Sequence, residues 1–442
     1  MVEKKGLAAL KRGVEYWNKW RRSDRYAQLD FRGLNLVEET LLGINFQGVN
    51  LAGAKLIKCN FGGANFDGAD LTGADLSETN LTGASLCGVK LTGANLVRAN
   101  YRGAESTASD LSLANLSHAD LRVVNFHGAE LSGANFNQAN LNSASFVGAN
   151  LTRVNFQLAS LDSTNFERAN LCQTNFKSAD LTNACLIGAN ACEANFSNAN
   201  LLSADLSQAD LTEANLSAAK LTRTSLSRAN LSRANLVNAS LTSANLQGAN
   251  LVKADLNRAN AVAANLSEAS LLGAKAWGTN FNRSVITGAC FENLKLDSNT
   301  SFVKVICRYL YLKYDRQQRF PQDPKANLSS LEFQAILQDL MDSVDVVFNE
   351  DLDWSIMLAA FNALQQKYSS HKIRLRAVNA ISNYRFIAKI KIEPSIETKA
   401  IEQYFRQQYN LAALAEVQSD RSTDRASQDR AVRESAVSYK QN

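Results

Sequence analysis

Several residue types are scarce in this sequence, and each scarcity narrows what the protein can be. Its 442 residues include 3 prolines, 3 histidines and 3 methionines, and aromatic residues make up 8%. No apolar run approaches the roughly 18 residues that a membrane-spanning helix needs. Residues 1–25 lack the apolar core of a signal peptide. The cytosol is therefore the expected location, with no transmembrane segment.

The cysteine pattern argues against a metal centre. The chain has 7 cysteines, an odd number without a CxxC pair, at Cys59, Cys87, Cys172, Cys185, Cys192, Cys290 and Cys307. This spacing indicates neither a zinc site nor a disulfide framework, and unpaired thiols fit a reducing compartment. The histidines, His118, His127 and His371, are too dispersed to form a metal trio. Because no phosphate-binding glycine loop, nucleophile elbow or His-Glu-x-x-His motif occurs either, we expect no metal and no cofactor.

What the sequence does have is a five-residue period. From Phe31 to Leu296 the central position recurs every five residues without insertion or deletion, and it is nearly always a large apolar residue. The unit is Ala, then Asn or Asp, then Leu or Phe, then two polar residues, as in residues 69–73. Neither the helical period of about 3.6 nor the strand period of about 2 divides five, so an ordinary helix or flat strand is excluded. Unbroken register over this length indicates a stacked-repeat architecture.

The pattern resembles the A(D/N)LXX signature of pentapeptide-repeat proteins over residues 31–296. The resemblance implies a mainly β fold, a right-handed quadrilateral parallel β-helix in which four units form one square coil. In such a solenoid each residue lies over the residue one coil further on, about 4.8 Å away.

Elementary packing explains why this sequence suits that fold. The Leu or Phe and the Ala two places before it both point inward, because bulky centres leave room only for a small second residue. The Asn or Asp before the centre can bond nearby backbone. Glycine two places after the centre, as at Gly53, permits a turn with positive φ. Since such glycines thin out after Gly148, we expect a different turn type beyond that point.

Columns of side chains follow from the coil length. Two phenylalanine ladders are expected on opposite faces: Phe136, Phe156, Phe176 and Phe196, and Phe126, Phe146 and Phe166. Ser106 interrupts the second ladder, which predicts loose packing there. Cys172 and Cys192 share an outward position one coil apart, and we expect them to remain free thiols because stacked parallel side chains orient poorly for a bond.

Different segments flank the repeat, which we assign to residues 31–298. Residues 1–30 are expected to cap its N-terminal end, with Gly6–Arg25 as one amphipathic helix; binding to a membrane surface is the alternative. Residues 299–418 predict a small α+β domain with helices on a sheet, and residues 419–442 a polar, disordered tail. Residues 307–311, 344–348 and 353–354 resemble an uncharacterised domain that follows pentapeptide repeats in cyanobacterial proteins, and residues 17–21 resemble the leader of such proteins.

Within residues 299–418 the pattern predicts helices at 329–343, 353–368 and 396–417 and strands at 344–348, 371–380 and 384–392. If this domain were catalytic, its candidate carboxylates would be Asp345, Asp351 and Asp353. Helix capping and solvated loop charge explain them without a catalytic role.

Two classes of function remain. The first is a non-enzymatic scaffold or regulatory adaptor that binds a protein partner, with nucleic acid not expected. Its candidate contacts are cations of the later repeats and two residues of the following domain: Lys220, Arg223, Arg228, Arg233, Lys253, Arg258, Arg308 and Trp354. The second is a ligand-sensing or catalytic C-terminal domain on a β-helical spacer, for which a polar pocket near Arg308, Trp354 or Arg376 would be the sign. A DNA-mimicking gyrase inhibitor ranks below both, because the outer surface is mildly basic rather than acidic.

Overall fold

A computed structural model describes residues 2–23, 29–313, 318–341, 343–348, 353–382, 385–392 and 400–415. The chain divides into two compact units, Met1–Ser329 and Ser330–Asn442, and each is described by itself. The tail expected at 419–442 lies outside the described residues.

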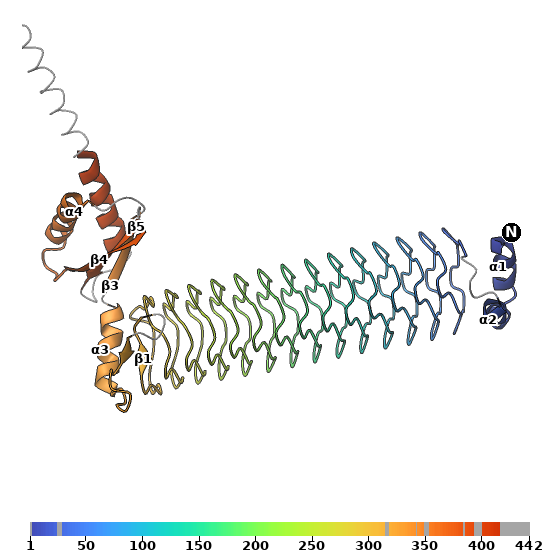
Figure 1. Ribbon diagram of the computed structural model, residues 1–442, viewed down its shortest axis with the longest axis horizontal. Helices are drawn as coiled ribbons and strands as arrows, with labels where there is room; N and C mark the ends of the chain where they lie inside the picture. Colours follow the sequence, from blue (N-terminus) through green and yellow to red (C-terminus); the bar gives the residue numbers. More distant parts are fainter. Residues whose placement is uncertain are drawn as a thin grey trace, which may run out of the picture. The chain divides into compact units, whose positions relative to one another are not determined.

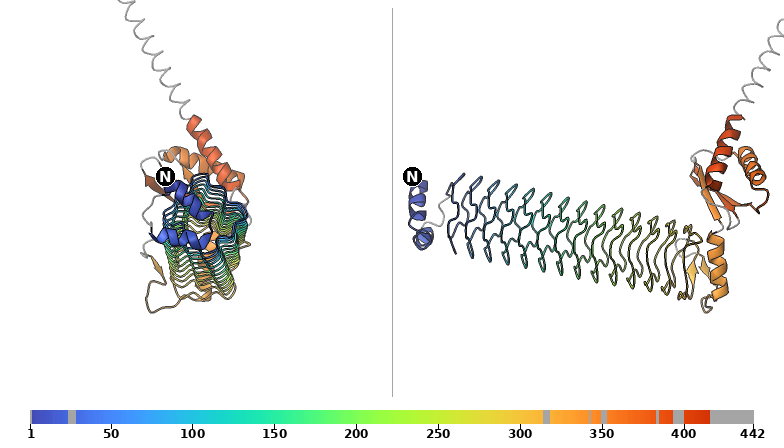
Figure 2. Two further views of the ribbon diagram at one scale, coloured as in Figure 1. Left: turned by 90° about the vertical axis from the view of Figure 1, so that its right-hand side faces the viewer. Right: turned by 180° about the vertical axis from the view of Figure 1, so that it is seen from behind.

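The repeat forms a β-helix solenoid (Figure 1). The residue before each centre pairs in parallel with the residue 20 positions later, from Asp30 with Asn50 to Lys275 with Lys295. Four such ladders run along the coils, and successive coils overlie one another in the end-on view of Figure 2. We number the faces 1 to 4 by the central residues of one coil, which are Leu131, Phe136, Leu141 and Phe146.

The interior of the β-helix is filled by side chains. The central Leu and Phe residues and the alanines two places before them are buried, most with no exposed surface. Both predicted phenylalanine ladders are confirmed: the rings of Phe136 and Phe156 lie 5.0 Å apart, and those of Phe126 and Phe146 lie 5.1 Å apart. Each stacked pair contributes about 0.5–1.5 kcal/mol beyond its burial.

The expected change of turn type after Gly148 does not occur. The second residue after the centre keeps a positive φ whether it is glycine or not, as at Gly53 (φ 64), Ser143 (φ 59) and Arg228 (φ 55). A side chain costs about 1–2 kcal/mol in this conformation. The coil imposes it because the same backbone N–H must reach the next coil, as Arg228 reaches the carbonyl of Gln247 at 2.9 Å.

The loose packing expected at Ser106 is also wrong. Tyr101, a central residue of face 3, is fully buried and places its hydroxyl 2.8 Å from Ser106 Oγ. Its ring stacks with that of Phe126 at 6.1 Å. A large residue on one face therefore fills the space that a small residue leaves on the next.

The N-terminal segment forms two helices, α1 (Val2–Leu10) and α2 (Val14–Ser23), rather than the single helix expected. The break falls at Gly13, whose φ of 98 is outside the helical range. Ala9, Leu10 and Trp17 are buried, so the apolar side that a membrane-surface helix would present is used within the protein.

Helix α2 covers the first coil. Its side chains donate hydrogen bonds to backbone carbonyls of that coil, which has no preceding coil to bond them. The indole N–H of Trp17 donates to the carbonyl of Asn45 at 2.7 Å, and Asn18 donates to the carbonyl of Gly43 at 2.9 Å. Arg21 donates to the carbonyl of Gln47. The Trp17 ring also packs 5.5 Å from that of Phe46. Both the open sheet edge and the apolar core are thereby covered.

At the other end the β-helix runs three ladder pairs further than the sequence predicted. Ser301, Ile306 and Tyr311 pair with residues 21 positions earlier instead of 20, because one residue is inserted at the turn held by Asp297. The strands β1 (Leu310–Tyr311) and β2 (Arg319–Phe320) follow as a short antiparallel pair. Residues 299–329 therefore belong to the β-helical unit, and the boundary expected at 298/299 falls at 329/330.

The second unit contains helix α3 (Ser330–Met341), strand β3 (Ser343–Phe348), helix α4 (Trp354–Lys367), and strands β4 (Arg374–Ser382) and β5 (Arg385–Lys391). Residues 400–415 are helical. The sheet is antiparallel in the order β3-β5-β4. Alternate strand residues such as Val346 and Ala388 pack against Leu364 of α4 and Phe405 in one core.

Candidate interaction surfaces

The outer surface of the β-helix is built from short polar side chains that bond to one another. On face 2, asparagine Nδ2 donates to the Oδ1 one coil earlier from Asn135 to Asn235, at distances such as 3.0 Å between Asn175 and Asn155. The same Oδ1 accepts the backbone N–H two residues on, as Asn175 does from Lys177 at 3.1 Å. Asparagine serves both roles, whereas a carboxylate only accepts.

At several inward positions threonine replaces alanine, and the hydroxyls of these threonines are not free. Their buried hydroxyls donate to the carbonyl 23 residues earlier at 2.7–3.0 Å, in Thr79, Thr164, Thr174, Thr224 and Thr279. These hydroxyls are satisfied structural groups.

The six predicted basic contacts of the β-helix do not share one face. Lys220 and Arg223 belong to face 3 and its following corner, and Arg228 to the corner after face 4. Arg233 and Lys253 are one coil apart at the corner after face 1, and Arg258 lies at the corner after face 2. Arg233 is also engaged by Glu213, 2.8 Å away. The sequence places these cations close together in the chain, but the coil distributes them around the β-helix.

The two remaining predicted contacts lie in different units. Arg308 is exposed on the last coil, where its N–H donates to Thr287 Oγ1 at 3.1 Å. Trp354 is the first residue of α4 and is 55% exposed. Beside it, the carboxylate of Asp353 caps α4 by accepting from the N–H of Ser355 at 2.7 Å. That bonding lowers the pKa of Asp353, which fits capping rather than catalysis.

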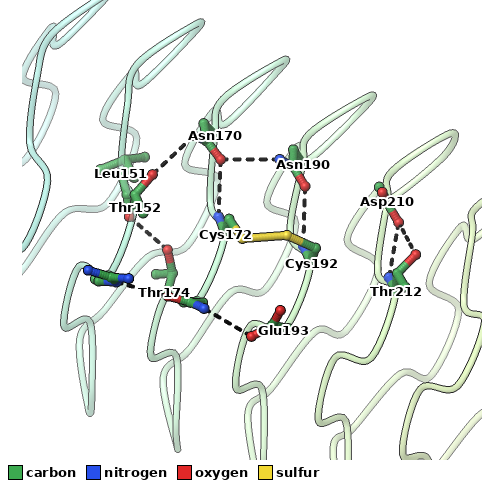
Figure 3. The surroundings of a disulfide bond; sticks show 12 residues. Leu151, Thr152, Asn170, Cys172, Thr174, Asn190, Cys192, Glu193, Asp210 and Thr212 are labelled. Carbon is green, nitrogen blue, oxygen red and sulfur yellow. Dashed lines mark hydrogen bonds between the residues drawn. A yellow bond between two sulfur atoms is a disulfide. The ribbon is translucent and has the colours of Figure 1, made fainter.

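The expectation of free thiols is wrong for one pair. Cys172 and Cys192 form a disulfide between adjacent coils of face 1 (Figure 3). Their Cα atoms are 4.8 Å apart, within the range a disulfide spans. Asn170 and Asn190 hold the two coils in register by bonding each other and accepting the cysteine N–H groups at 3.3 Å. The other five cysteines are free.

Burial raises the pKa of three of those free thiols. They are Cys59, Cys290 and Cys307, and the pKa of Cys307 rises to about 12. No group of three or more metal-ligating side chains occurs in the described part of the chain. His371 lies near Tyr368 and Ser370, and its Nδ1 is 2.9 Å from Ser370 Oγ.

The C-terminal unit carries a polar hollow of about 620 Å³ between the end of α4 and the start of β4. Amide, hydroxyl and basic side chains line it: Asn362, Gln365, Gln366, Ser369, His371, Lys372 and Arg374, with Ile373. Trp354 is at the start of α4 and does not line this hollow, which lies at the end of the same helix. Asp351 and the side chain of Asp345 lie outside the described part of the chain, and Asp353 does not line the hollow.

One surface feature was missed from the sequence. Trp277, on face 2, is 43% exposed. Its position just after a central residue normally holds a small polar side chain, so an aromatic residue there was the available signal.

Comparison with protein families agrees with the geometry of the coils. A model for pentapeptide repeats, in 8 copies, matches residues 29–63, 44–83, 90–128, 193–228, 224–260 and 264–298. A model for a pentapeptide repeat region matches residues 119–196. Together these matches cover more than half of the chain. The chain belongs to the pentapeptide-repeat family. Membership of this family implies that the parallel coils of the chain wind as a right-handed β-helix.

Solved pentapeptide-repeat proteins are similar in sequence over the repeat. HetL, involved in heterocyst differentiation regulation in the cyanobacterium Nostoc sp. strain PCC 7120, is 28% identical, with 61% of this chain and 93% of that chain covered and a TM-score of 0.19. A protein of the Arabidopsis thaliana thylakoid lumen is 35% identical over 22% of this chain and 68% of its own, with a TM-score of 0.22. QnrB1, a plasmid-mediated fluoroquinolone resistance protein, is 23% identical over 42% and 85%, with a TM-score of 0.26. No curated protein gives a significant match.

Acidic side chains of this pentapeptide-repeat protein do not form an unbroken stripe on face 1. Asp70, Asp110 and Glu130 share one ladder, but Lys90 stands between them. Asn150, Asn170 and Asn190 follow on the same ladder before the next acid, Asp210. Among the described helices, none has both the length and the hydropathy to cross a membrane.

Proposed function

We propose that the protein is a non-enzymatic interaction scaffold or regulatory adaptor, in which a four-sided β-helical rod carries an α+β domain that recruits a protein partner. One observation carries the proposal: the inward side chains of the β-helix are almost all fully buried, so its chemistry is confined to the outer surface. Catalysis needs a concave site with convergent polar groups. A filled solenoid instead presents regular faces to other proteins.

The test is affinity capture from native lysate with the full chain as bait, read by quantitative mass spectrometry. Trp354→Glu should abolish capture if the exposed indole at the start of α4 contacts the partner. Leu331→Glu is the matched control, because Leu331 is the second residue of α3 and is 79% exposed. Loss of a specific partner with the first variant alone supports recruitment by the C-terminal unit. Recovery of no specific protein by the wild-type chain would contradict the scaffold.

The polar hollow beside Arg374 favours a second candidate, a ligand-sensing C-terminal domain on a β-helical spacer. Two cations and several amides line it, a composition that suits a small anion. Thermal shift of the full chain against inorganic phosphate and small carboxylates tests this reading. A shift that Arg374→Gln removes would favour it over the scaffold, and no shift with any of these anions would count against it.

A gyrase-inhibiting role is a weaker proposal, because a duplex-like acidic stripe would have to bypass Lys90. Inhibition of gyrase supercoiling by the full chain would be the direct test. We also propose a cytoplasmic location: the five free cysteines support it, whereas the Cys172–Cys192 disulfide is of a kind more common in oxidising compartments. Fractionation of cells that express a tagged chain checks it.

A further inference from the structure

Trp277 is a large aromatic residue at an outward position of face 2. The positions equivalent to Trp277 one coil before and after it hold the polar residues Asn257 and Asp297. The backbone N–H of Trp277 donates to Asn257 Oδ1 at 2.9 Å, a bond that any residue could make. The 43% exposed side chain leaves apolar surface in water, and such surface often marks a contact site.

Lysines lie next to this indole on face 2. Lys275 and Trp277 flank the inward Ala276, so both side chains point outward. Lys275 Nζ is 3.8 Å from Asp255, and Lys295 follows Lys275 on the same ladder. The side chain of Lys275 is 53% exposed.

Two further cations lie beside the glycines at the two corners that flank Trp277. A Cβ added at Gly273 would lie 3.6 Å from Lys253 Cγ, and one added at Gly278 would lie 3.6 Å from Arg258 Cγ. The basic side chains of the preceding coil therefore extend along the surface over both corners that bound the indole. We call Lys253, Arg258, Lys275, Trp277 and Lys295 the Trp277 patch.

The charge of the patch is positive. Its four cations face two carboxylates, Asp255 and Asp297, on the same face. The Asp297 carboxylate is engaged within the last turn, accepting from the Gly278 N–H and from Thr300 Oγ1, each at 2.7 Å. Both carboxylates stay charged, and four cations against two carboxylates leave an excess of two positive charges around the indole.

The backbone of this row cannot add a partner strand. The N–H of Lys275 donates to the carbonyl of Ala254 at 2.9 Å, and that of Ala276 donates to Lys295 at 2.8 Å. Recognition must come from side chains alone. An indole with basic side chains at both neighbouring corners suits an apolar side chain flanked by carboxylates.

We infer that the Trp277 patch docks an acidic segment of a partner protein, with an aromatic or aliphatic side chain against the indole and carboxylates on Lys253, Arg258 and Lys275. This inference rests on the proposed scaffold function and names the chemistry of its partner. A nucleic acid fits less well, because its backbone requires a continuous basic track. Here Asp255 and Asp297 stand on either side of the Trp277 row along the coils.

Fluorescence anisotropy of the full chain with a labelled peptide tests the docking. The probe is a short peptide of alternating glutamate and phenylalanine; its lysine–phenylalanine counterpart and a single-stranded oligodeoxynucleotide are the comparison probes. The acidic peptide should bind, and added salt should weaken the binding. Trp277→Ala and the double variant Lys253→Glu/Arg258→Glu should each weaken it by about tenfold or more.

Lys177→Glu is the matched control, because Lys177 occupies the position of Trp277 on face 2 in an earlier coil and is exposed. It should leave the affinity within about twofold. The inference is overturned if the acidic peptide fails to bind, if Lys177→Glu weakens it as much as Trp277→Ala, or if the oligodeoxynucleotide binds more tightly through the same residues. Capture of a lysate partner that Trp277→Ala leaves intact would overturn the patch while sparing the scaffold.

Discussion

Inside the β-helix the hydroxyl of Tyr101 lies 2.8 Å from Ser106 Oγ, so that one large and one small central residue complement each other across neighbouring faces. Both side chains are fully buried. Burial also raises the pKa of the Tyr101 phenol, so its hydroxyl stays protonated.

This complementarity predicts a non-additive pair of substitutions. Ser106→Leu should lower the free energy of unfolding by about 1–3 kcal/mol through overpacking, and Tyr101→Leu by about 2 kcal/mol or more through the void and the unpaired hydroxyl. The double variant places a leucine at the centre of both neighbouring faces and should cost less than the sum. Chemical denaturation of the four proteins measures the cycle, and additive costs would show that the two sites are independent.

The asparagine ladder of face 2 predicts a difference between donor and acceptor roles. Asn175→Asp keeps the acceptor for the Lys177 N–H but loses the donor to Asn155. We expect a loss of about 0.5–1.5 kcal/mol in unfolding free energy. Asp75→Asn is the control, since Asp75 only accepts, from Asn95 at 3.0 Å and from the Ser77 N–H at 3.1 Å. Equal stability of wild type and Asn175→Asp would show that the side-chain ladder contributes nothing.

The corner residue Val123 should be improved by glycine. It is a β-branched residue at φ 60 and is 58% exposed, so it bears the strain of the left-handed conformation with little burial to offset it. Val123→Gly should raise the unfolding free energy by about 1 kcal/mol. Ser143→Gly, one coil later at φ 59, should give a smaller gain because serine is not β-branched. Thermal unfolding compares the two, and destabilisation by Val123→Gly would refute the strain.

Alkylation rates test the environment of Cys307. Its burial raises the thiol pKa from 9.0 to about 12, so at mildly alkaline pH its thiolate fraction is about a thousandfold lower than that of an ordinary cysteine. The iodoacetamide rate at Cys307, followed by peptide mass spectrometry, should keep rising with pH above 9.0 towards about 12. A plateau near pH 9.0 would mean that the thiol is solvated as in a free peptide.

How much of the fold could be predicted depends on whether each feature is encoded by residues at a fixed spacing in the sequence. The five-residue period specifies the coil, and the phenylalanine ladders follow by adding one coil length. The final ladder pairs were missed because one inserted residue near Asp297 shifts the period, although Phe302 still stacks on Phe281 at 4.9 Å. The break at Gly13 was missed because the apolar stripe continues across it.

Surface features were harder to predict than the core. Short spacing in the chain suggested a basic cluster from Lys220 to Arg258, yet each five-residue step turns to a new face. The Trp277 patch assembles residues from three coils, which only the twenty-residue column reveals. The Cys172–Cys192 bond depends on local side-chain orientation that a repeat pattern does not encode.

The most direct test of the scaffold is cross-linking mass spectrometry of the full chain with the protein that it captures from native lysate. The account predicts cross-links from the partner to outward lysines or to the C-terminal unit, with the inward columns untouched. Recovery of the chain alone, with a small molecule bound in the hollow beside Arg374, would contradict the scaffold and favour a ligand sensor.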